Sequence, residues 1–147
     1  MERTLVLIKP DAVGQRKIGS VISRFEEEGL RVLALKMVFL SKEEGSRFYQ
    51  VHREKPFYGS LIEFISSGPI VAMVLEGKEA ISRVRELMGA TDPSKAKEGT
   101  IRREMGTDVE RNAVHGSDSA ASAATEIPFF FNEMETFARG EQDVARG

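Results

Sequence analysis

His115 is the first residue of this 147-residue chain to consider for chemistry, and it lies in the run Asn112-Ala-Val-His-Gly-Ser-Asp-Ser119. An unperturbed imidazole has a pKa of about 6.5, so it is mostly neutral and nucleophilic at neutral pH. A nucleophilic histidine needs a partner on its other ring nitrogen to fix the tautomer and raise the basicity. Glu126, on the helix expected to follow, could supply that partner. Spacing alone favours a structural or surface histidine, so further residues have to decide.

Basic side chains elsewhere in the chain could build an anion site. Arg85 ends an amphipathic helical face, Arg102 lies in a glycine-bearing loop, and Lys9 and Thr91 could join them. Arginine forks match phosphate oxygens and stay charged, although a single arginine is most often a solvated surface charge. The glycines form neither G-x-x-x-x-G-K-[ST] nor G-x-G-x-x-G, which argues against a P-loop or a protein-kinase site.

One aromatic residue could recognise a flat ligand. Phe57 follows Pro56 at an expected helix start, where its ring could stack on another ring; a core or interface aromatic is the commoner alternative. Tyr49 and His52 are expected on the preceding helix. His52 is interpreted as a surface or capping residue.

Composition removes several classes of protein. The absence of cysteine excludes disulfides, thiolate nucleophiles and thiolate metal sites, and two histidines cannot build a multi-histidine zinc site. The formal net charge of −2 argues against a nucleic-acid binder held by a basic field. No apolar run approaches the roughly 18 residues that cross a bilayer, and no export signal is recognised. We expect a cytoplasmic enzyme or binding protein.

The elements that must position these residues alternate between strand and helix. Apolar runs predict strands over residues 4–8, 30–40 and 70–75, the last central and buried because it carries no charge. Helical spacing or caps predict helices over residues 18–28, 41–52, 57–66, 79–88 and 120–127, with Pro128 ending or kinking the last. Residues 89–113 are read as a long functional loop. The order is close to a split βαβ pattern with helices on one face of an antiparallel sheet; a small parallel sheet remains the alternative. We expect one domain over residues 1–137 and a loose tail over 138–147.

Six segments in order give the chain a resemblance to nucleoside diphosphate kinases, from Arg3 to about Phe131. They are Thr4-Leu-Val-Leu-Ile-Lys-Pro-Asp11, Arg53-Glu-Lys-Pro-Phe57, Ser67-Gly-Pro-Ile-Val-Ala-Met-Val74, Met88-Gly-Ala-Thr-Asp-Pro93, Gly99-Thr-Ile-Arg102 and Asn112-Ala-Val-His-Gly-Ser-Asp-Ser119. The last matches the family's active-site signature and is the most specific of the six.

The resemblance implies transfer of a γ-phosphate, mainly from ATP, to nucleoside diphosphates through a phosphohistidine at Nδ1 of His115. It implies that Glu126 holds the imidazole and that Ser117 supports Glu126. Positions matching contacts to phosphates, ribose hydroxyls or the histidine are Lys9, Tyr49, Arg85, Thr91, Arg102 and Asn112. Phe57 and Val109 match the residues on either face of the base, with Leu61 beside them. Mg²⁺ is expected on the nucleotide phosphates, without a protein metal ligand.

The family fold implied is a ferredoxin-like α/β (α+β) sandwich with a four-stranded antiparallel sheet. The resemblance also implies a homo-oligomer; the segment 129–135 favours a tetramer over a hexamer. No membrane contact and no dedicated nucleic-acid surface are expected. The chain departs from the family pattern at Met105, Glu110 and Pro128.

Two other functions compete with the enzyme. A phosphohistidine carrier or protein-histidine kinase would use the same His115 but would not need Phe57 and Val109 as a base clamp. A non-enzymatic binding or regulatory module would be expected to carry a broken signature or a basic surface. The intact signature and the net charge of −2 favour the enzyme.

Overall fold

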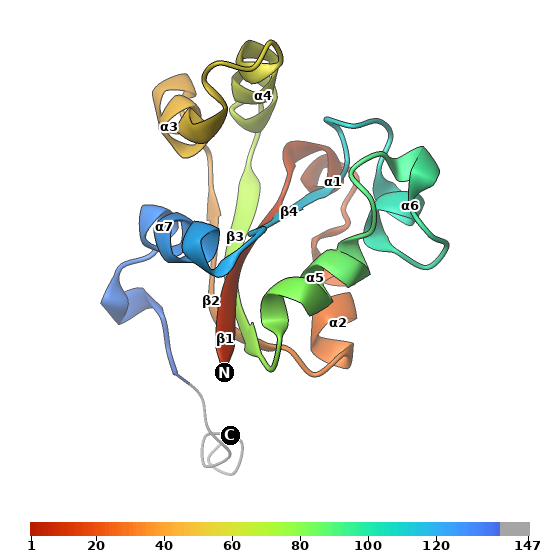
Figure 1. Cartoon of the computed structure of the whole chain (residues 1–147), viewed down its shortest axis with the longest axis vertical. Coiled ribbons are helices and arrows are strands. Elements are labelled where there is room, and N and C mark those ends of the chain that lie inside the picture. The colour runs from red at the N-terminus through yellow and green to blue at the C-terminus, as the bar shows by residue number, and fades with distance from the viewer. Residues whose placement is uncertain (139–147) are drawn as a thin grey trace.

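The computed structural model describes residues 1–138, and within them four strands form one antiparallel sheet in the order β2-β3-β1-β4. The strands are β1 (Glu2–Ile8), β2 (Arg31–Val38), β3 (Ile70–Gly77) and β4 (Val114–Gly116). The helices are α1 (Pro10–Gly14), α2 (Ile18–Glu27), α3 (Lys42–Phe48), α4 (Tyr58–Ile65), α5 (Ala80–Met88), α6 (Ile101–Met105) and α7 (Ala120–Phe130), shown in Figure 1. Short 3-10 turns occur at Gln50–His52, Pro93–Lys95 and Glu133–Glu135.

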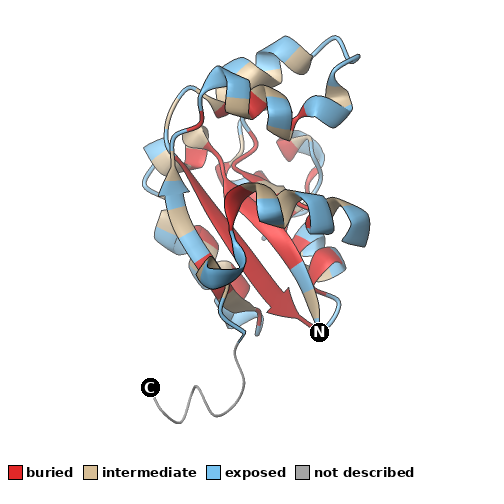
Figure 2. Ribbon diagram, turned by 90° about the vertical axis from the view of Figure 1, so that its left-hand side faces the viewer, coloured by how far each residue is buried: buried red, intermediate tan, exposed pale blue. Residues whose placement is uncertain are grey.

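The sheet has two inner strands, β1 and β3, which are paired over seven residues from Glu2↔Gly77 to Ile8↔Val71. β3 is buried along its whole length and β1 from Thr4 onward (Figure 2), which agrees with the prediction that residues 70–75 are central and buried. β4 is short and pairs with β1 at Leu7↔His115. The nucleophile candidate therefore lies on an outer strand, held by a fully buried neighbour.

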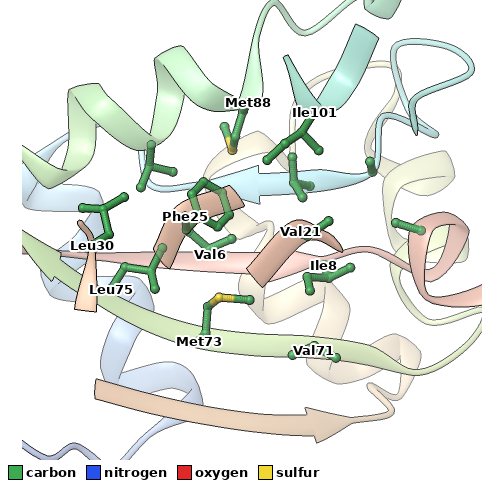
Figure 3. Packing of buried hydrophobic residues seen from close by; sticks show 14 of the residues in the cluster. Val6, Ile8, Val21, Phe25, Leu30, Val71, Met73, Leu75, Met88 and Ile101 are labelled. Atoms are coloured by element: carbon green, nitrogen blue, oxygen red, sulfur yellow. The ribbon is translucent and has the colours of Figure 1, made fainter. Parts of the chain in front are cut away.

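Apolar residues of β1 point alternately to the two faces of the sheet, as the period of a strand requires. Val6 and Ile8 pack with α2 and α5 in one core cluster, where Phe25 and Met88 meet them (Figure 3). Leu5 and Leu7 belong to a second cluster on the opposite face, formed with α4 and the end of α7. Helices cover both faces, so the expectation of helices on one face is wrong, although the predicted four-stranded antiparallel sandwich is confirmed.

The helix that the Ser41–Glu44 spacing predicts begins where expected. Ser41 Oγ accepts from the backbone N–H of Glu44 at 3.1 Å, and the Glu44 carboxylate accepts from the backbone N–H of Ser41 at 2.8 Å. These bonds satisfy two donors that a helix start leaves free. The helix ends at Phe48, and the chain continues through a 3-10 turn to His52 rather than as one helix.

Two expectations about the last third of the chain need correction. The loop of residues 89–113 contains α6, a single short helix that buries Ile101 and Met105 and is too short to leave a periodic signal. Pro128 does not end α7, which continues to Phe130. Proline lies in the last turn, where the carbonyl that it leaves free belongs to exposed Ala124, and the backbone N–H of Phe131 still donates to Ile127. The predicted tail falls almost wholly outside the described residues, so the domain division stays a prediction.

Candidate active site

A cavity of about 480 Å³ opens between the turn after α3, α4, α5, the loop before β4, and α7. It brings together nearly all the residues that the sequence singles out: Lys9, Tyr49, Phe57, Leu61, Arg85, Thr91, Arg102, Val109, Asn112, His115 and Glu126. Ser117 is fully buried behind its wall. A hollow of about 570 Å³ along β2 holds none of them and is lined by apolar residues and Glu135.

At one end of the cavity, the His115 ring is held through Nε2. This nitrogen lies 3.0 Å from Glu126 Oε1, and an ionised carboxylate only accepts hydrogen bonds, so Nε2 carries the proton. Nδ1 then keeps its lone pair, and residues 1–138 give it no hydrogen bond. The edge of the Phe48 ring contacts the imidazole at 5.4 Å between centroids. These two contacts fix the orientation of the ring and leave Nδ1 as the ring nitrogen that Glu126 does not engage.

Ser117 connects this pair to the sheet. Its Oγ donates to Glu126 Oε1 at 2.8 Å and accepts from the backbone N–H of Leu5 at 3.2 Å. The backbone N–H of Ser117 donates to the Leu5 carbonyl at 3.0 Å. Through these bonds, the inner strand β1 positions the carboxylate that positions the imidazole.

The backbone just before His115 makes an unusual turn. Ala113 has φ +73°, and the backbone N–H of Val114 donates to the carbonyl of Asn112 at 2.9 Å, which is a γ-turn. Such a conformation costs on the order of 1–3 kcal/mol and persists when its surroundings dictate it. Asp11 Oδ2 accepts from the N–H of Ala113 at 2.9 Å, and the N–H of Lys9 donates to the Ala113 carbonyl at 2.8 Å. The end of β1 thus holds the strained residue in place.

Lys9 provides a buried ammonium on the cavity wall. Its Nζ donates to the carbonyl of Glu110 at 2.7 Å and to Asn112 Oδ1 at 2.9 Å. Burial lowers the pKa of Lys9 to about 8, and the negative charge of Asp11 partly offsets this lowering. The Asn112 amide donates to the carbonyls of Thr91 and Val109, at 3.0 and 3.1 Å, and so links three cavity segments.

Arg102 is a second buried cation. Its guanidinium donates to the carbonyls of Gly89 and Val114, at 3.0 and 2.9 Å, and fixes the backbone beside His115. Burial lowers the pKa of Arg102 to about 10, helped by the nearby charge of Arg85, so it stays protonated at neutral pH. Its Nε is buried without a partner in the part of the chain that the structure describes. The two arginines and Lys9 make this end of the cavity suitable for polyanions.

Tyr49 lies on the wall that adjoins this anion site. Burial raises the pKa of its hydroxyl well above its ordinary value, with the charges of Glu126 and Glu110 adding to the effect. Tyr49 therefore remains a neutral phenol that can donate a hydrogen bond to a ligand oxygen.

The other end of the cavity is apolar and more open. The Phe57 side chain is 44% exposed at the start of α4, and Val109 on the loop is 60% exposed. Leu61, one turn after Phe57, is half-buried. A flat ring entering between Phe57 and Val109 would cover apolar surface on both of its faces.

His52 is placed differently from the sequence interpretation. It lines the cavity, and its ring lies 6.0 Å from the Phe57 ring and 6.2 Å from the Tyr49 ring. Its Nδ1 is buried and lacks a partner within residues 1–138. The prediction of a surface or capping role is wrong because the 3-10 turn after α3 rotates this residue inward. A histidine three residues after Tyr49 was the signal available.

Sequence reasoning did not assign Phe48, Val51 or Ser122 to the site. Val51 and Ser122 line the cavity, and Phe48 backs the imidazole. Ser122 donates to Asp118, and this bond is the main cause of the lowered pKa of Asp118. One helical turn separates Asp118 from Ser122, which is a spacing that sequence alone could have shown.

The site offers no dedicated metal cage. No cluster of three His, Cys, Asp or Glu residues suited to a metal is found among the described residues. Of the cavity carboxylates, Glu126 is committed to His115 and Ser117, and Asp118 accepts from Ser122. None of the described helices is long and apolar enough to cross a membrane.

Comparison with known proteins identifies the family. The family described as nucleoside diphosphate kinase matches residues 2–136. The nucleoside diphosphate kinase of Persephonella marina is 57% identical over 135 residues, which cover 92% of this chain and 96% of that protein. The relative of the same name from Nitratiruptor sp. is 55% identical over 135 residues, with 92% and 98% covered.

Solved structures agree over nearly the whole chain. The nucleoside diphosphate kinase of Aquifex aeolicus is similar with a TM-score of 0.90 and 48% identity, over 92% of this chain and 98% of that chain. The nucleoside diphosphate kinase of Halobacterium salinarum, solved in complex with CDP, has a TM-score of 0.92 and 40% identity, over 99% and 97%. The family match over residues 2–136 and these identities show that the chain belongs to the nucleoside diphosphate kinase family.

Proposed function

We propose that this enzyme transfers the γ-phosphate of a nucleoside triphosphate, chiefly ATP, to nucleoside diphosphates through a phosphohistidine on His115. The observation that carries the proposal is the hydrogen bond from Nε2 of His115 to Glu126, which leaves Nδ1 as the nucleophile beside a cationic cavity. A covalent intermediate lets donor and acceptor use one site in turn, in a ping-pong cycle.

In the first half-reaction, Nδ1 attacks the γ-phosphorus. The N–P bond forms as the bond from phosphorus to the β,γ-bridging oxygen breaks, and the nucleoside diphosphate leaves with that electron pair. The imidazole ring gains positive charge, which the Glu126 carboxylate stabilises at 3.0 Å from Nε2. In the second half-reaction, a terminal phosphate oxygen of the acceptor diphosphate attacks the phosphohistidine, and the electron pair returns to Nδ1.

Alignment and charge neutralisation carry most of the catalysis, because phosphoryl transfer passes through a loose transition state. Arg85, Arg102 and Lys9 supply positive charge, and Thr91, Tyr49 and Asn112 supply polar groups around them. Mg²⁺ bound to the nucleotide phosphates enters as part of the substrate and neutralises charge on the transferring group. The nucleotide base stacks between Phe57 and Val109, beside Leu61.

We further infer a homo-oligomer, with a tetramer favoured over a hexamer, in the cytoplasm. Support for association comes from the outer strand β2, where Leu35 and Met37 are 51% and 55% exposed, and from Phe39 just after it, which is 63% exposed. Such a row of apolar side chains on an outer strand suits burial against another chain. Sedimentation of the purified protein would give the number of subunits directly.

The deciding experiment is incubation with γ-labelled ATP and Mg²⁺ without acceptor, followed by a chase with GDP. We expect one acid-labile phosphate per chain, located by mass spectrometry on His115, that moves to GDP. Because the chain contains only His52 as a second histidine, peptide mapping distinguishes the two unambiguously. His115→Gln, checked for unchanged circular dichroism, is the matched control and should take up no label.

Two results would overturn the proposal. Label that enters His115 but does not move to GDP would indicate a carrier that passes phosphate to a partner protein. Absence of label in a preparation that binds ATP would indicate a binding module.

A further inference from the structure

The two sides of the base-binding end belong to different segments of the chain. One side is α4, with Phe57 at its start and Leu61 one turn later; the other is the loop of residues 106–112, with Val109. We call these two sides the α4 jaw and the loop jaw. A direct hydrogen bond joins them: Ser60 Oγ on α4 donates to Glu110 Oε2 on the loop, at 2.6 Å.

We propose that the Ser60–Glu110 hydrogen bond holds the two jaws at the spacing that a nucleotide base requires, which makes Glu110 a positioning residue for nucleotide binding. This inference rests on the proposed function, because it takes the space between Phe57 and Val109 as the base site. Glu110 directly follows the stacking residue Val109, and Ser60 directly precedes Leu61, which lies beside the stacked base. A link at these positions therefore acts directly on the separation of the two apolar surfaces.

The remaining contacts of Glu110 give its side chain a stiff support. Its backbone carbonyl accepts from Lys9 Nζ at 2.7 Å, and its backbone N–H donates to Asp108 Oδ1 at 3.0 Å. The backbone of Glu110 is thus tied to the phosphate end of the cavity, while its carboxylate reaches α4. Because both ends of the Glu110 side chain are held, it can fix the distance between the loop and α4.

A second contact between the jaws lies one helical turn further on. The Arg111 guanidinium lies 5.6 Å from the centroid of the Phe64 ring, and Phe64 follows Ser60 by four residues on the same face of α4. Adjacent loop residues thus contact adjacent turns of the helix. With two contacts in line, loss of the Ser60–Glu110 bond would loosen the jaws at the end where the base enters without detaching the loop.

Preorganisation lowers the ordering cost that a ligand otherwise meets on binding. The bond is exposed, so its loss should raise the Kd for nucleotides by about two- to fivefold, in the range of a single exposed hydrogen bond to a charged acceptor. The carboxylate also places negative charge in a cavity that takes polyanions. Replacing it by a neutral acceptor should keep the link and remove that repulsion.

This reasoning defines four variants. Ser60→Ala and Glu110→Ala should each raise the Kd for ADP and CDP by the same factor, and the double variant should be no worse than Glu110→Ala alone. Glu110→Gln retains an acceptor for Ser60 and should bind at least as tightly as the unaltered protein. Calorimetric titration gives Kd, and steady-state rates should show an increased KM with kcat unchanged.

Matched controls separate the link from general effects. Ser23→Ala breaks another exposed serine–glutamate hydrogen bond, to Glu27 on α2, away from the cavity, and should change nothing. Phosphorylation of His115 by phosphoramidate, which has no base, should proceed equally in all variants. Failure of the inference and failure of the proposed function are distinguishable. If ATP does not label even the unaltered protein, the proposed function fails, but the Kd values of the variants still test the Ser60–Glu110 link.

Three results would overturn the inference. Unchanged Kd values in Ser60→Ala and Glu110→Ala would mean that the jaws keep their spacing without the bond. Additive losses in the double variant would mean that the two residues act separately. Losses in Glu110→Gln that differ between ADP and CDP would mean that the carboxylate contacts the base itself.

Discussion

The two ends of the cavity are built in opposite ways. At the phosphate end, His115, Glu126 and Ser117 are joined by bonds of 2.8 to 3.0 Å and anchored to the buried strand β1. At the base end, Phe57 and Val109 are 44% and 60% exposed, and an exposed hydrogen bond links their two segments.

This difference suggests that one end of the cavity sets the rate of phosphoryl transfer and the other sets the recognition of the base. Buried hydrogen bonds fix a nucleophile in one orientation, which phosphoryl transfer requires. Stacking between apolar surfaces accepts every base, since each base has a π-face and no base-edge contact is needed. An enzyme that equalises nucleotide pools needs strict geometry for the phosphates and tolerance for the bases.

The largest effect should come from the nucleophile. In the proposed mechanism His115→Gln removes the atom that forms the N–P bond, so transfer should fall by on the order of 10⁴-fold or more. A coupled assay of GTP formation from ATP and GDP measures the loss, with thermal melting to check the fold. Residual transfer well above background in a preparation free of host enzyme would place the nucleophile elsewhere.

Next in size is the partner of the nucleophile. Glu126→Ala leaves Nε2 without its acceptor and Ser117 without its partner, so kcat should fall by roughly 10- to 100-fold with little change in Kd. Stopped-flow measurement of phosphohistidine formation isolates the step. Glu126→Gln keeps a hydrogen-bond acceptor but not the charge, so its kcat should lie between those of the unaltered protein and Glu126→Ala. An unaltered rate in Glu126→Ala would mean that the phosphate end does not depend on its hydrogen bonds.

Substitution at the base end should change nucleotide affinity rather than kcat. Phe57→Ala should weaken nucleotide binding by about 1–2 kcal/mol, the lower part of the range for a stacked base, because much of the ring is exposed. Titration with ADP and CDP measures the loss, which should be similar for both, while the rate of labelling at saturating ATP stays close to normal. A loss in kcat alone would contradict the division between the two ends.

The smallest predicted effect concerns pH. Burial lowers the pKa of Lys9 to about 8, so its ammonium loses its proton as the pH rises through that value. Bound phosphates favour the charged form, so affinity for ADP should fall by about fourfold between pH 7 and 8.5, with proton uptake on binding above pH 8. Titrations in two buffers of different ionisation enthalpy detect that uptake. Lys9→Met should bind weakly at both values and lose the pH dependence.

The same shift has the opposite sign for stability. The pKa of Lys9 is lowered on folding from an ordinary 10.5 to about 8, so the unfolded chain holds the proton more tightly. Between these two values the unfolded state binds more protons, and the contribution of Lys9 to the free energy of unfolding therefore rises with pH. In alkaline solution the affinity for ADP should therefore fall while the contribution of Lys9 to the free energy of unfolding rises.

Much of the phosphate end was predictable because its signals are local. His115 and Glu126 are eleven residues apart on a strand and the following helix, and the signature around the histidine is contiguous. The positive φ of Ala113 was not predictable, because alanine gives no sign of such a conformation. Asp11, which is 102 residues away in the chain, holds it through a hydrogen bond to the N–H of Ala113. Strain that is held by distant partners leaves no mark on the strained residue.

The base end was predicted only through the family resemblance. His52 was assigned to the surface or to a cap on a helix predicted to run through residue 52, and nothing in the sequence indicated the 3-10 turn that replaces the end of that helix. The Ser60–Glu110 bond spans 50 residues and joins an exposed serine to a half-buried glutamate. Glu110 departs from the family pattern, but nothing in its own segment identifies Ser60 as its partner. Tertiary packing decides such contacts, and a single sequence does not encode them in a readable pattern.

The pairing of β4 with β1 has a consequence for how the protein is made. The strand that carries His115 is the last of the described sheet to leave the ribosome, and its neighbour β1 is the first. Their contact, Leu7↔His115, has a very large sequence separation, and contacts of this kind form late in folding. The nascent chain should therefore remain unable to accept phosphate until β4 and α7 have been synthesised and paired with β1.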